Sequence, residues 1–231
     1  MVKIYFLFFT VLFFVADACR GQHLHESFGG IVRVETSTGR GTGFVVAKTS
    51  DQFEVWTNAH VAGKVGEQVV VRHHAGTKSQ KSYAGVVAWS AYDGTRDAAK
   101  VLCKGSFSGD VIPVDSGSGD PELFITGGHP LGLRSYCLTV ERKSGKDFGD
   151  VIAYVPSSIK GQSGSPIVNR AGRVVGVVTL KLGSGRNAVG GMLPVDHWTG
   201  NTNASVSVIG FGEFKPLSNA IVNIEDDHDG G

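Results

Sequence analysis

Lys160-Gly-Gln-Ser-Gly-Ser-Pro166 is the stretch of the 231-residue sequence on which the interpretation of the whole chain depends. Glycines stand two residues before Ser163 and directly after it, so the backbone can turn sharply and direct the Ser163 hydroxyl and nearby amides toward one point. Serine is a poor nucleophile at neutral pH. It needs a base with a pKa near 7, which means a histidine, and a carboxylate that fixes the histidine tautomer.

Two upstream segments supply a histidine and an aspartate of this kind. Trp56-Thr-Asn-Ala-His60 ends an apolar run, which is preceded by Gly41-Thr-Gly-Phe44, and Arg96-Asp97-Ala-Ala places an aspartate at the start of another run. Taken singly, each of these residues has an ordinary structural interpretation. Ser163 would mark a turn, His60 would be a surface or core histidine, and Asp97 would begin a strand. Their combination favours nucleophilic catalysis.

The rest of the chain predicts strands and turns. Thirty-three glycines and the lack of a long helical period accompany twelve short β-rich runs between Ile31 and Val195, two of them being Val86–Trp89 and Val101–Leu102. Such spacing indicates an all-β sandwich or barrel. The turn-forming residues around Ser116-Gly-Ser-Gly119 divide the runs into two sets of six, so we expect a linker at residues 109–121.

The two ends of the chain are expected to lie outside this fold. Residues 1–18 combine an early lysine, an apolar run and Ala16-Asp-Ala18, which predicts a secretory signal peptide cleaved after Ala18. An uncleaved anchor is the alternative, and after cleavage no segment could cross a membrane. Residues 201–231 form an acidic C-terminal extension. The expected location is therefore secreted or periplasmic.

Composition excludes several partners. The formal net charge of +1 shows no excess of basic residues that would favour binding to nucleic acid. The sequence contains no C-x-x-C pair of the kind that indicates a zinc site. We expect no metal and no cofactor. An oxidising compartment would permit a Cys103–Cys137 disulfide, and two buried free thiols are the other option.

The order His60, Asp97, Ser163 resembles that of the chymotrypsin-fold serine proteases. Thr57-Asn-Ala-His60, Asp97-Ala-Ala99 and Gly161-Gln-Ser-Gly-Ser-Pro166 match that family's motifs, as they occur in its simpler bacterial and viral branches (HtrA-like, glutamyl-endopeptidase-like and sobemovirus-like). The resemblance implies two six-stranded antiparallel β-barrels with the active site between them. Residues 19–108 would carry His60 and Asp97, and residues 122–200 would carry Ser163.

The resemblance also assigns roles. Ser163 would be the nucleophile, His60 the general base and then acid, and Asp97 the residue that orients His60, with an oxyanion hole formed by the N–H groups of Gly161 and Ser163. The substrate pocket would include five residues, namely Ser157, Thr179, Lys181, Gly190 and Gly191. Because Ser157 is not a carboxylate and no histidine stands at Val178 or Thr179, we expect a small or medium uncharged P1 residue.

Two departures from the family pattern carry predictions. Lys100 stands where the strand after the aspartate is usually apolar, which makes Asp93 a competitor for the role of Asp97. Gln162 stands where digestive relatives have an aspartate that pairs with a new amino terminus, and Phe28-Gly-Gly-Ile-Val32 inverts the usual Ile-Val-Gly-Gly. We therefore expect that no activation cleavage is needed.

The predicted function is a serine endopeptidase that acts as a monomer on protein or peptide substrates through an acyl-enzyme. Two alternatives stay open. One is a catalytically inactive binding module with the same fold, and the other is a membrane-tethered viral protease that processes a polyprotein.

Overall fold

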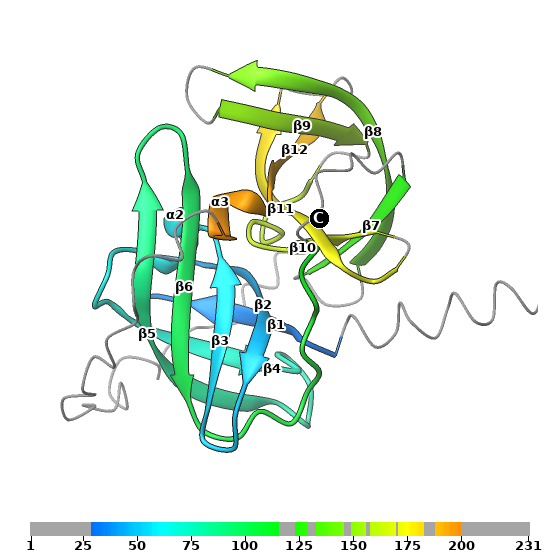
Figure 1. The fold of residues 1–231 in the computed structure, drawn as a ribbon. Coiled ribbons are helices and arrows are strands. Elements are labelled where there is room, and N and C mark those ends of the chain that lie inside the picture. Colours follow the sequence, from blue (N-terminus) through cyan, green and yellow to red (C-terminus); the bar gives the residue numbers. More distant parts are fainter. Residues whose placement is uncertain are drawn as a thin grey trace, which may run out of the picture. The chain divides into compact units, whose positions relative to one another are not determined.

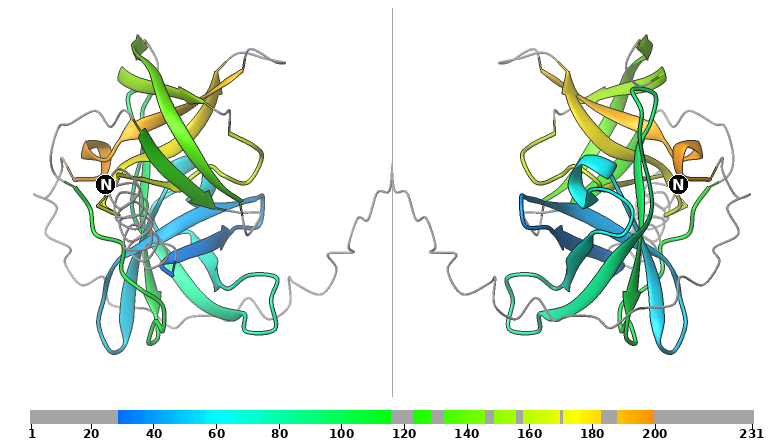
Figure 2. Two further views of the ribbon diagram at one scale, coloured as in Figure 1. Left: turned by 90° about the vertical axis from the view of Figure 1, so that its right-hand side faces the viewer. Right: turned by 90° about the vertical axis from the view of Figure 1, so that its left-hand side faces the viewer.

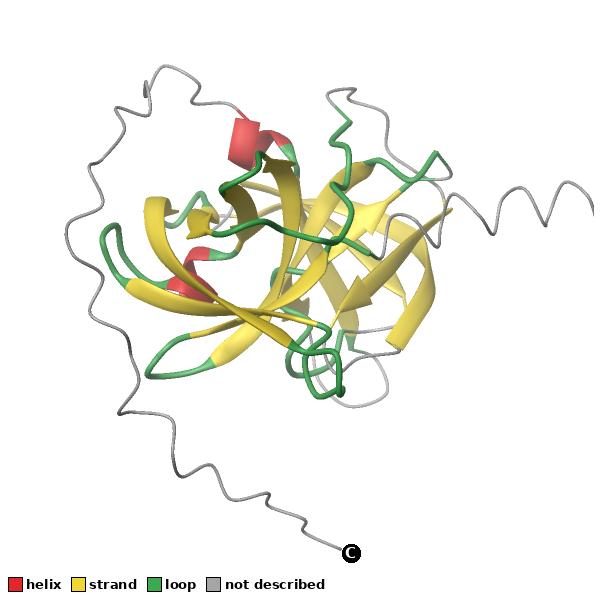
Figure 3. Ribbon diagram, turned by 90° about the horizontal axis from the view of Figure 1, so that it is seen from below, coloured by secondary structure: helices red, strands yellow, loops and turns green. Residues whose placement is uncertain are grey.

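The computed structural model describes residues 29–115, 123–128, 133–145, 149–155, 158–169, 171–182 and 188–199. The predicted signal peptide, the acidic extension, Cys19 and Ser157 lie outside the described residues. Strands dominate the fold, and the two described helices, α2 (Ala59–Ala62) and α3 (Asp196–Thr199), have four residues each (Figure 3). None of the described helices has the length and apolar character needed to cross a membrane.

The first six strands close into an antiparallel barrel, here called the first barrel. They pair in the order β1-β2-β3-β6-β5-β4, and β1 also pairs with β4 (Figure 1). Their bounds are β1 Ile31–Glu35, β2 Arg40–Lys48, β3 Gln52–Thr57, β4 Gln68–His73, β5 Lys81–Tyr92 and β6 Asp97–Lys104.

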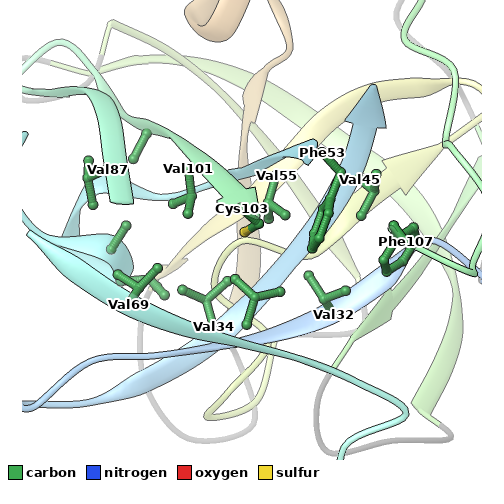
Figure 4. Close-up of a cluster of buried hydrophobic side chains, with 14 of the residues drawn as sticks. Val32, Val34, Val45, Phe53, Val55, Val69, Val87, Val101, Cys103 and Phe107 are labelled. Atoms are coloured by element: carbon green, nitrogen blue, oxygen red, sulfur yellow. The ribbon is translucent and has the colours of Figure 1, made fainter. Parts of the chain in front are cut away.

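The interior of the first barrel is filled by branched and aromatic side chains, which fit the half-buried surface of a pleated sheet (Figure 4). Val32 and Val34 alternate with the polar Arg33 and Glu35 along β1, so that one face of the strand enters the core. Cys103 lies in this core as a free thiol. Burial raises the pKa of that thiol well above its usual range, which keeps it protonated and unreactive. The free thiol is thus the option found for Cys103.

The other six strands, here called the second group, also pair antiparallel. Their order is β10-β11-β12-β9-β8-β7, and β10 contacts β7 through two residue pairs, Ile167 with Thr126 and Val168 with Ile125. Their bounds are β7 Leu123–Gly128, β8 Leu133–Gly145, β9 Gly149–Val155, β10 Pro166–Val168, β11 Val174–Leu182 and β12 Val189–Pro194. The prediction of a mainly β chain with a six-stranded barrel that carries His60 and Asp97 is confirmed.

A second core cluster joins the two sets of strands. Phe44 and Trp56 of the first barrel share it with Val177 and Leu193 of the second group. Trp198 of α3, which follows β12 (Figure 2), also belongs to this cluster, and its indole N–H donates to the Thr57 carbonyl at 2.9 Å. The end of β3, three residues before His60, is thereby held by a residue from the far end of the described chain.

Candidate active site

His60 lies on the single turn of α2, directly after β3. Ala59, Val61 and Ala62 are buried, whereas the His60 side chain is 37% exposed. The turn begins at Asn58, whose carbonyl accepts the N–H of Ala62. Three small or branched apolar residues therefore anchor the helix, and the fourth position presents an imidazole to solvent.

Asp97 begins β6 beneath this turn and orients the imidazole. Its side chain is 3% exposed, and its Oδ2 lies 2.5 Å from His60 Nδ1, while its Oδ1 accepts the backbone N–H of His60 at 3.0 Å. A carboxylate only accepts hydrogen bonds, so Nδ1 carries the proton. The His60 Nε2 is then left as the ring atom that can accept a proton, as a general base requires.

Asp93, the alternative to Asp97 as the aspartate that orients His60, lies in the exposed turn before β6 and is hydrogen-bonded within that turn. Its carboxylate accepts hydrogen bonds from the backbone and hydroxyl of Thr95 and from the backbone and guanidinium of Arg96. These donors hold the pKa of Asp93 well below its usual range. The aspartate that reaches His60 is Asp97.

Lys100, the other departure noted in the sequence, lies against aromatic rings. Trp56, Lys100 and Trp89 are successive Cα partners across β3, β6 and β5. The Lys100 ammonium lies 5.2 Å from the ring centroid of Trp56 and 5.7 Å from that of Trp89. Cation–π contacts and packing of the aliphatic stem thus accommodate a charge at a position where an apolar side chain is usual.

The loop around Ser163 depends on its two glycines. Gly161 and Gly164 have φ angles of +94° and +86°, in the left-handed region that favours glycine. The loop is closed by the Ser165 N–H, which donates to the Gln162 carbonyl, and it is tied to β11 by the Gly164 N–H, which donates to the Val178 carbonyl, both at 2.8 Å. The backbone at Ser163 is therefore fixed on both sides.

Thr42 of β2 holds the same loop from the first barrel. Its N–H donates to the Ser163 carbonyl at 2.8 Å, and its hydroxyl donates to the Gly161 carbonyl at 2.7 Å. A Cβ added to Gly41 would lie 2.7 Å from the Val61 side chain and 3.0 Å from the Ser163 carbonyl oxygen. Gly41 thus lies between the residue after His60 and the candidate nucleophile, which brings the two motifs together.

The backbone amides of this loop leave two donors available. Within the described part of the chain, the N–H groups of Gly161 and Ser163 have no hydrogen-bond acceptor, whereas those of Gln162, Gly164 and Ser165 do. Unpaired N–H groups on either side of one residue form a site for an oxygen that carries negative charge.

The trypsin-like peptidase domain model matches residues 41–177, which is more than half of the chain and includes all three motifs. The chain belongs to the trypsin-like peptidase family. Its structural neighbours are chymotrypsin-fold serine proteases, so the resemblance noted from the sequence is confirmed. No curated protein matches the chain at the sequence level.

Three solved structures illustrate this fold. The Rv3671c protease from M. tuberculosis in its active form is 22% identical with a TM-score of 0.61, and the match covers 77% of this chain and 81% of that one. A human pathogenic astrovirus serine protease is 21% identical with a TM-score of 0.54, covering 73% and 90%. A serine endoprotease from Yersinia pestis is 20% identical with a TM-score of 0.59, covering 78% and 64%.

Asn58 is a residue of this peptidase site that sequence reasoning did not single out. Its buried side-chain N–H₂ donates to the Asp97 carbonyl at 2.9 Å and to the Thr179 hydroxyl at 3.1 Å. Asn58 therefore links the strand of the aspartate to β11. The only indication of this role in the sequence was that Asn58 stands within the motif Thr57–His60, since both hydrogen-bond partners of its side chain are distant along the chain.

The described residues of the predicted pocket separate into three groups. Thr179 is buried, and its hydroxyl lies against Asn58 and the Val177 carbonyl, so it belongs with the Asp97 environment. Lys181 and Gly190 are Cα partners on β11 and β12. A Cβ on Gly191 would meet Leu180 and Val151, on the opposite face of the strand. Ser157 lies outside the described residues.

Within the described residues, no group of three or more His, Cys, Asp or Glu side chains could hold a metal ion.

Proposed function

We propose that this trypsin-like peptidase is a serine endopeptidase that uses Ser163, His60 and Asp97, with the active site between two β-barrels. The observation that carries the proposal is the buried Asp97 carboxylate, whose two oxygens face the side chain and the backbone of His60. An enzyme of this kind needs an imidazole held in one tautomer beside a serine loop, and Thr42 together with Gly41 supplies that proximity.

The chemistry follows from these positions. The Ser163 hydroxyl attacks the scissile carbonyl carbon while His60 Nε2 accepts its proton, and the carbonyl oxygen becomes an oxyanion bound by the N–H groups of Gly161 and Ser163. The C–N bond then breaks as His60 gives the proton to the leaving amine, which produces the acyl-enzyme. Water, deprotonated by His60, attacks the ester and releases the acid, so Ser163 recovers its proton.

Activity without an activation cleavage is part of the proposal. Gln162 is buried, its side-chain oxygen accepts the Ile159 N–H at 2.9 Å, and its own N–H donates to the Ile159 carbonyl at 3.2 Å. Its side-chain oxygen and its backbone N–H are therefore both bonded within the loop. Gly30, directly before Ile31, accepts the Val45 N–H at 2.9 Å and continues into β1. The loop thus needs no ion pair with a new amino terminus.

The experiment is to produce the chain from Gln22 onward and to assay it on an internally quenched peptide library. We expect hydrolysis by the uncut protein, with intact mass confirming that the amino terminus is unchanged. Activity that arises only after cleavage before Ile31 would contradict activation-independent function. Absence of hydrolysis by both the uncut and the cut protein would contradict the proposed endopeptidase itself.

Export through the signal peptide, action as a monomer and a protein or peptide substrate also belong to the proposed function.

A further inference from the structure

Asn58 stands at the N-cap of α2, but its side chain does not cap the helix. A capping asparagine normally accepts an N–H of the first helical turn through its side-chain oxygen. Here the Asp97 Oδ1 accepts the N–H of His60 instead, at 3.0 Å. The carboxylate that faces the imidazole therefore also caps the helix, and the Asn58 side chain bonds elsewhere.

The hydrogen bonds of Asn58 fix the direction in which its amide group points. The Asp97 carbonyl can only accept, so the Asn58 atom that lies 2.9 Å from it is the donating nitrogen. The same nitrogen lies 3.1 Å from the Thr179 hydroxyl, which donates its own hydrogen to the Val177 carbonyl at 3.0 Å. The Thr179 oxygen thus accepts, and one amide group joins β6 to β11.

The bond to the Asp97 carbonyl lies beyond the last backbone partners of two strands. The Cα partners of β3 and β6 end at Thr57 and Ala99, two residues short of Asp97. The Asn58 N–H₂ supplies a donor of the kind that a longer β3 would supply through its backbone. On its other side Asp97 pairs with Tyr92 of β5. Asn58 therefore holds the main chain of Asp97 on the side that faces β3.

The environment of Asn58 excludes a direct contact with a substrate. The residue is fully buried, and within the described part of the chain its side-chain oxygen has no hydrogen-bond partner. A buried polar atom without a partner lowers stability, so its presence in a folded protein needs an explanation. The explanation here is the position of Asp97, whose two carboxylate oxygens face His60. Asn58 can affect the reaction only through the groups that it holds.

We propose that Asn58 is a positioning residue, which keeps the Asp97 carboxylate aligned with His60 by tying the Asp97 main chain to Thr179 of β11. The inference rests on the proposed endopeptidase function and adds a residue to its machinery. The alignment of the imidazole determines how well it accepts the serine proton, and a misplacement of about 1 Å can lower a rate about 100-fold. Loss of the Asn58 amide should thus lower kcat and leave KM unchanged.

The test compares kcat and KM on one fluorogenic peptide for the wild type and three variants. Asn58→Leu keeps the approximate size of the side chain and removes its N–H₂. Thr179→Val keeps the shape of that side chain and removes the acceptor on β11. Ser90→Ala is the matched control, because it deletes a hydrogen bond of 2.8 Å to the Gly63 carbonyl at the other end of α2. Thermal unfolding shows whether each protein is folded, and proton NMR in water records the His60 Nδ1–H.

We expect Asn58→Leu to lower kcat about 10- to 100-fold, with KM within about twofold of the wild-type value. The resonance of the His60 Nδ1–H should broaden or move upfield, because its hydrogen bond to Asp97 loosens. Thr179→Val should lower kcat several-fold. The double variant should be no slower than Asn58→Leu, because both changes act on one linkage. Ser90→Ala should keep the wild-type kcat and the wild-type resonance.

A folded Asn58→Leu protein with a wild-type kcat, or with a loss confined to KM, would overturn this proposal alone. An equal loss of kcat in Ser90→Ala would also overturn it, since any weakening of α2 would then suffice. If Asn58→Leu does not fold, Thr179→Val decides, and an unchanged kcat in that variant would overturn the proposal. A folded wild type that hydrolyses no peptide would overturn the proposed function and this inference together.

Discussion

Replacement of Asp97 by asparagine is expected to lower kcat/KM by about 10⁴-fold. The amide keeps the shape of the carboxylate but can present an N–H to His60 Nδ1, which in the wild type faces Oδ2 at 2.5 Å. The imidazole would then carry its proton on Nε2 and could not accept the proton of Ser163. Steady-state kinetics on one fluorogenic peptide measure the loss.

Asp93→Asn is the matched control, since it makes the same chemical change four residues earlier in an exposed turn. Its carboxylate bonds only to Thr95 and Arg96 among the described residues, so we expect kcat/KM close to that of the wild type. If Asp93→Asn lost activity while Asp97→Asn kept it, the aspartate of the triad would be Asp93.

Replacement of Gly164 by alanine is expected to lower kcat/KM by at least about 100-fold, because small displacements of a reacting group have effects of this size. The residue has φ +86°, and an added Cβ would overlap the Thr42 carbonyl oxygen and approach the Thr57 hydroxyl to 2.5 Å. Relief of these contacts requires the Ser163 loop to move away from Thr42. The loss would be measured as kcat/KM per probe-reactive serine.

Gly76→Ala separates this steric effect from backbone strain. Gly76 has φ +79° with open space around its Cβ position. The Gly76→Ala substitution should lower the free energy of unfolding by about 1–2 kcal/mol, because alanine is strained in the left-handed backbone conformation, and it should leave kcat/KM unchanged. Equal activity losses in both variants would show that positive φ, and not the contact with Thr42, is responsible.

Much of the strand pattern followed from the sequence, because alternating branched residues and glycine-bearing breaks are local properties. All twelve predicted runs coincide with strands. The run predicted at Val86–Trp89 is part of β5, which extends over Lys81–Tyr92, and Val101–Leu102 is part of β6, which extends over Asp97–Lys104. Apart from Tyr83, Tyr92 and Cys103, the added residues are glycine, alanine and polar side chains, which are held in the sheet by pairing with neighbouring strands.

The site was less accessible to sequence reasoning where it depends on contacts between distant residues. The motifs indicated His60 and Asp97 because each motif is local. Thr42 holds a loop 119 residues away. Tyr154 meets Gly190 across two strands whose pairing no local pattern predicts. These contacts between distant residues therefore became visible only in the fold.

The most direct test of the account is the site at which a fluorophosphonate attaches to the folded protein. The account predicts one adduct, mapped by mass spectrometry of proteolytic fragments to Ser163, and none in Ser163→Ala. A binding module without catalytic competence would give no adduct although its thermal unfolding showed it to be folded. That result, or an equal adduct in Ser163→Ala, would contradict the assignment of Ser163 as an activated nucleophile.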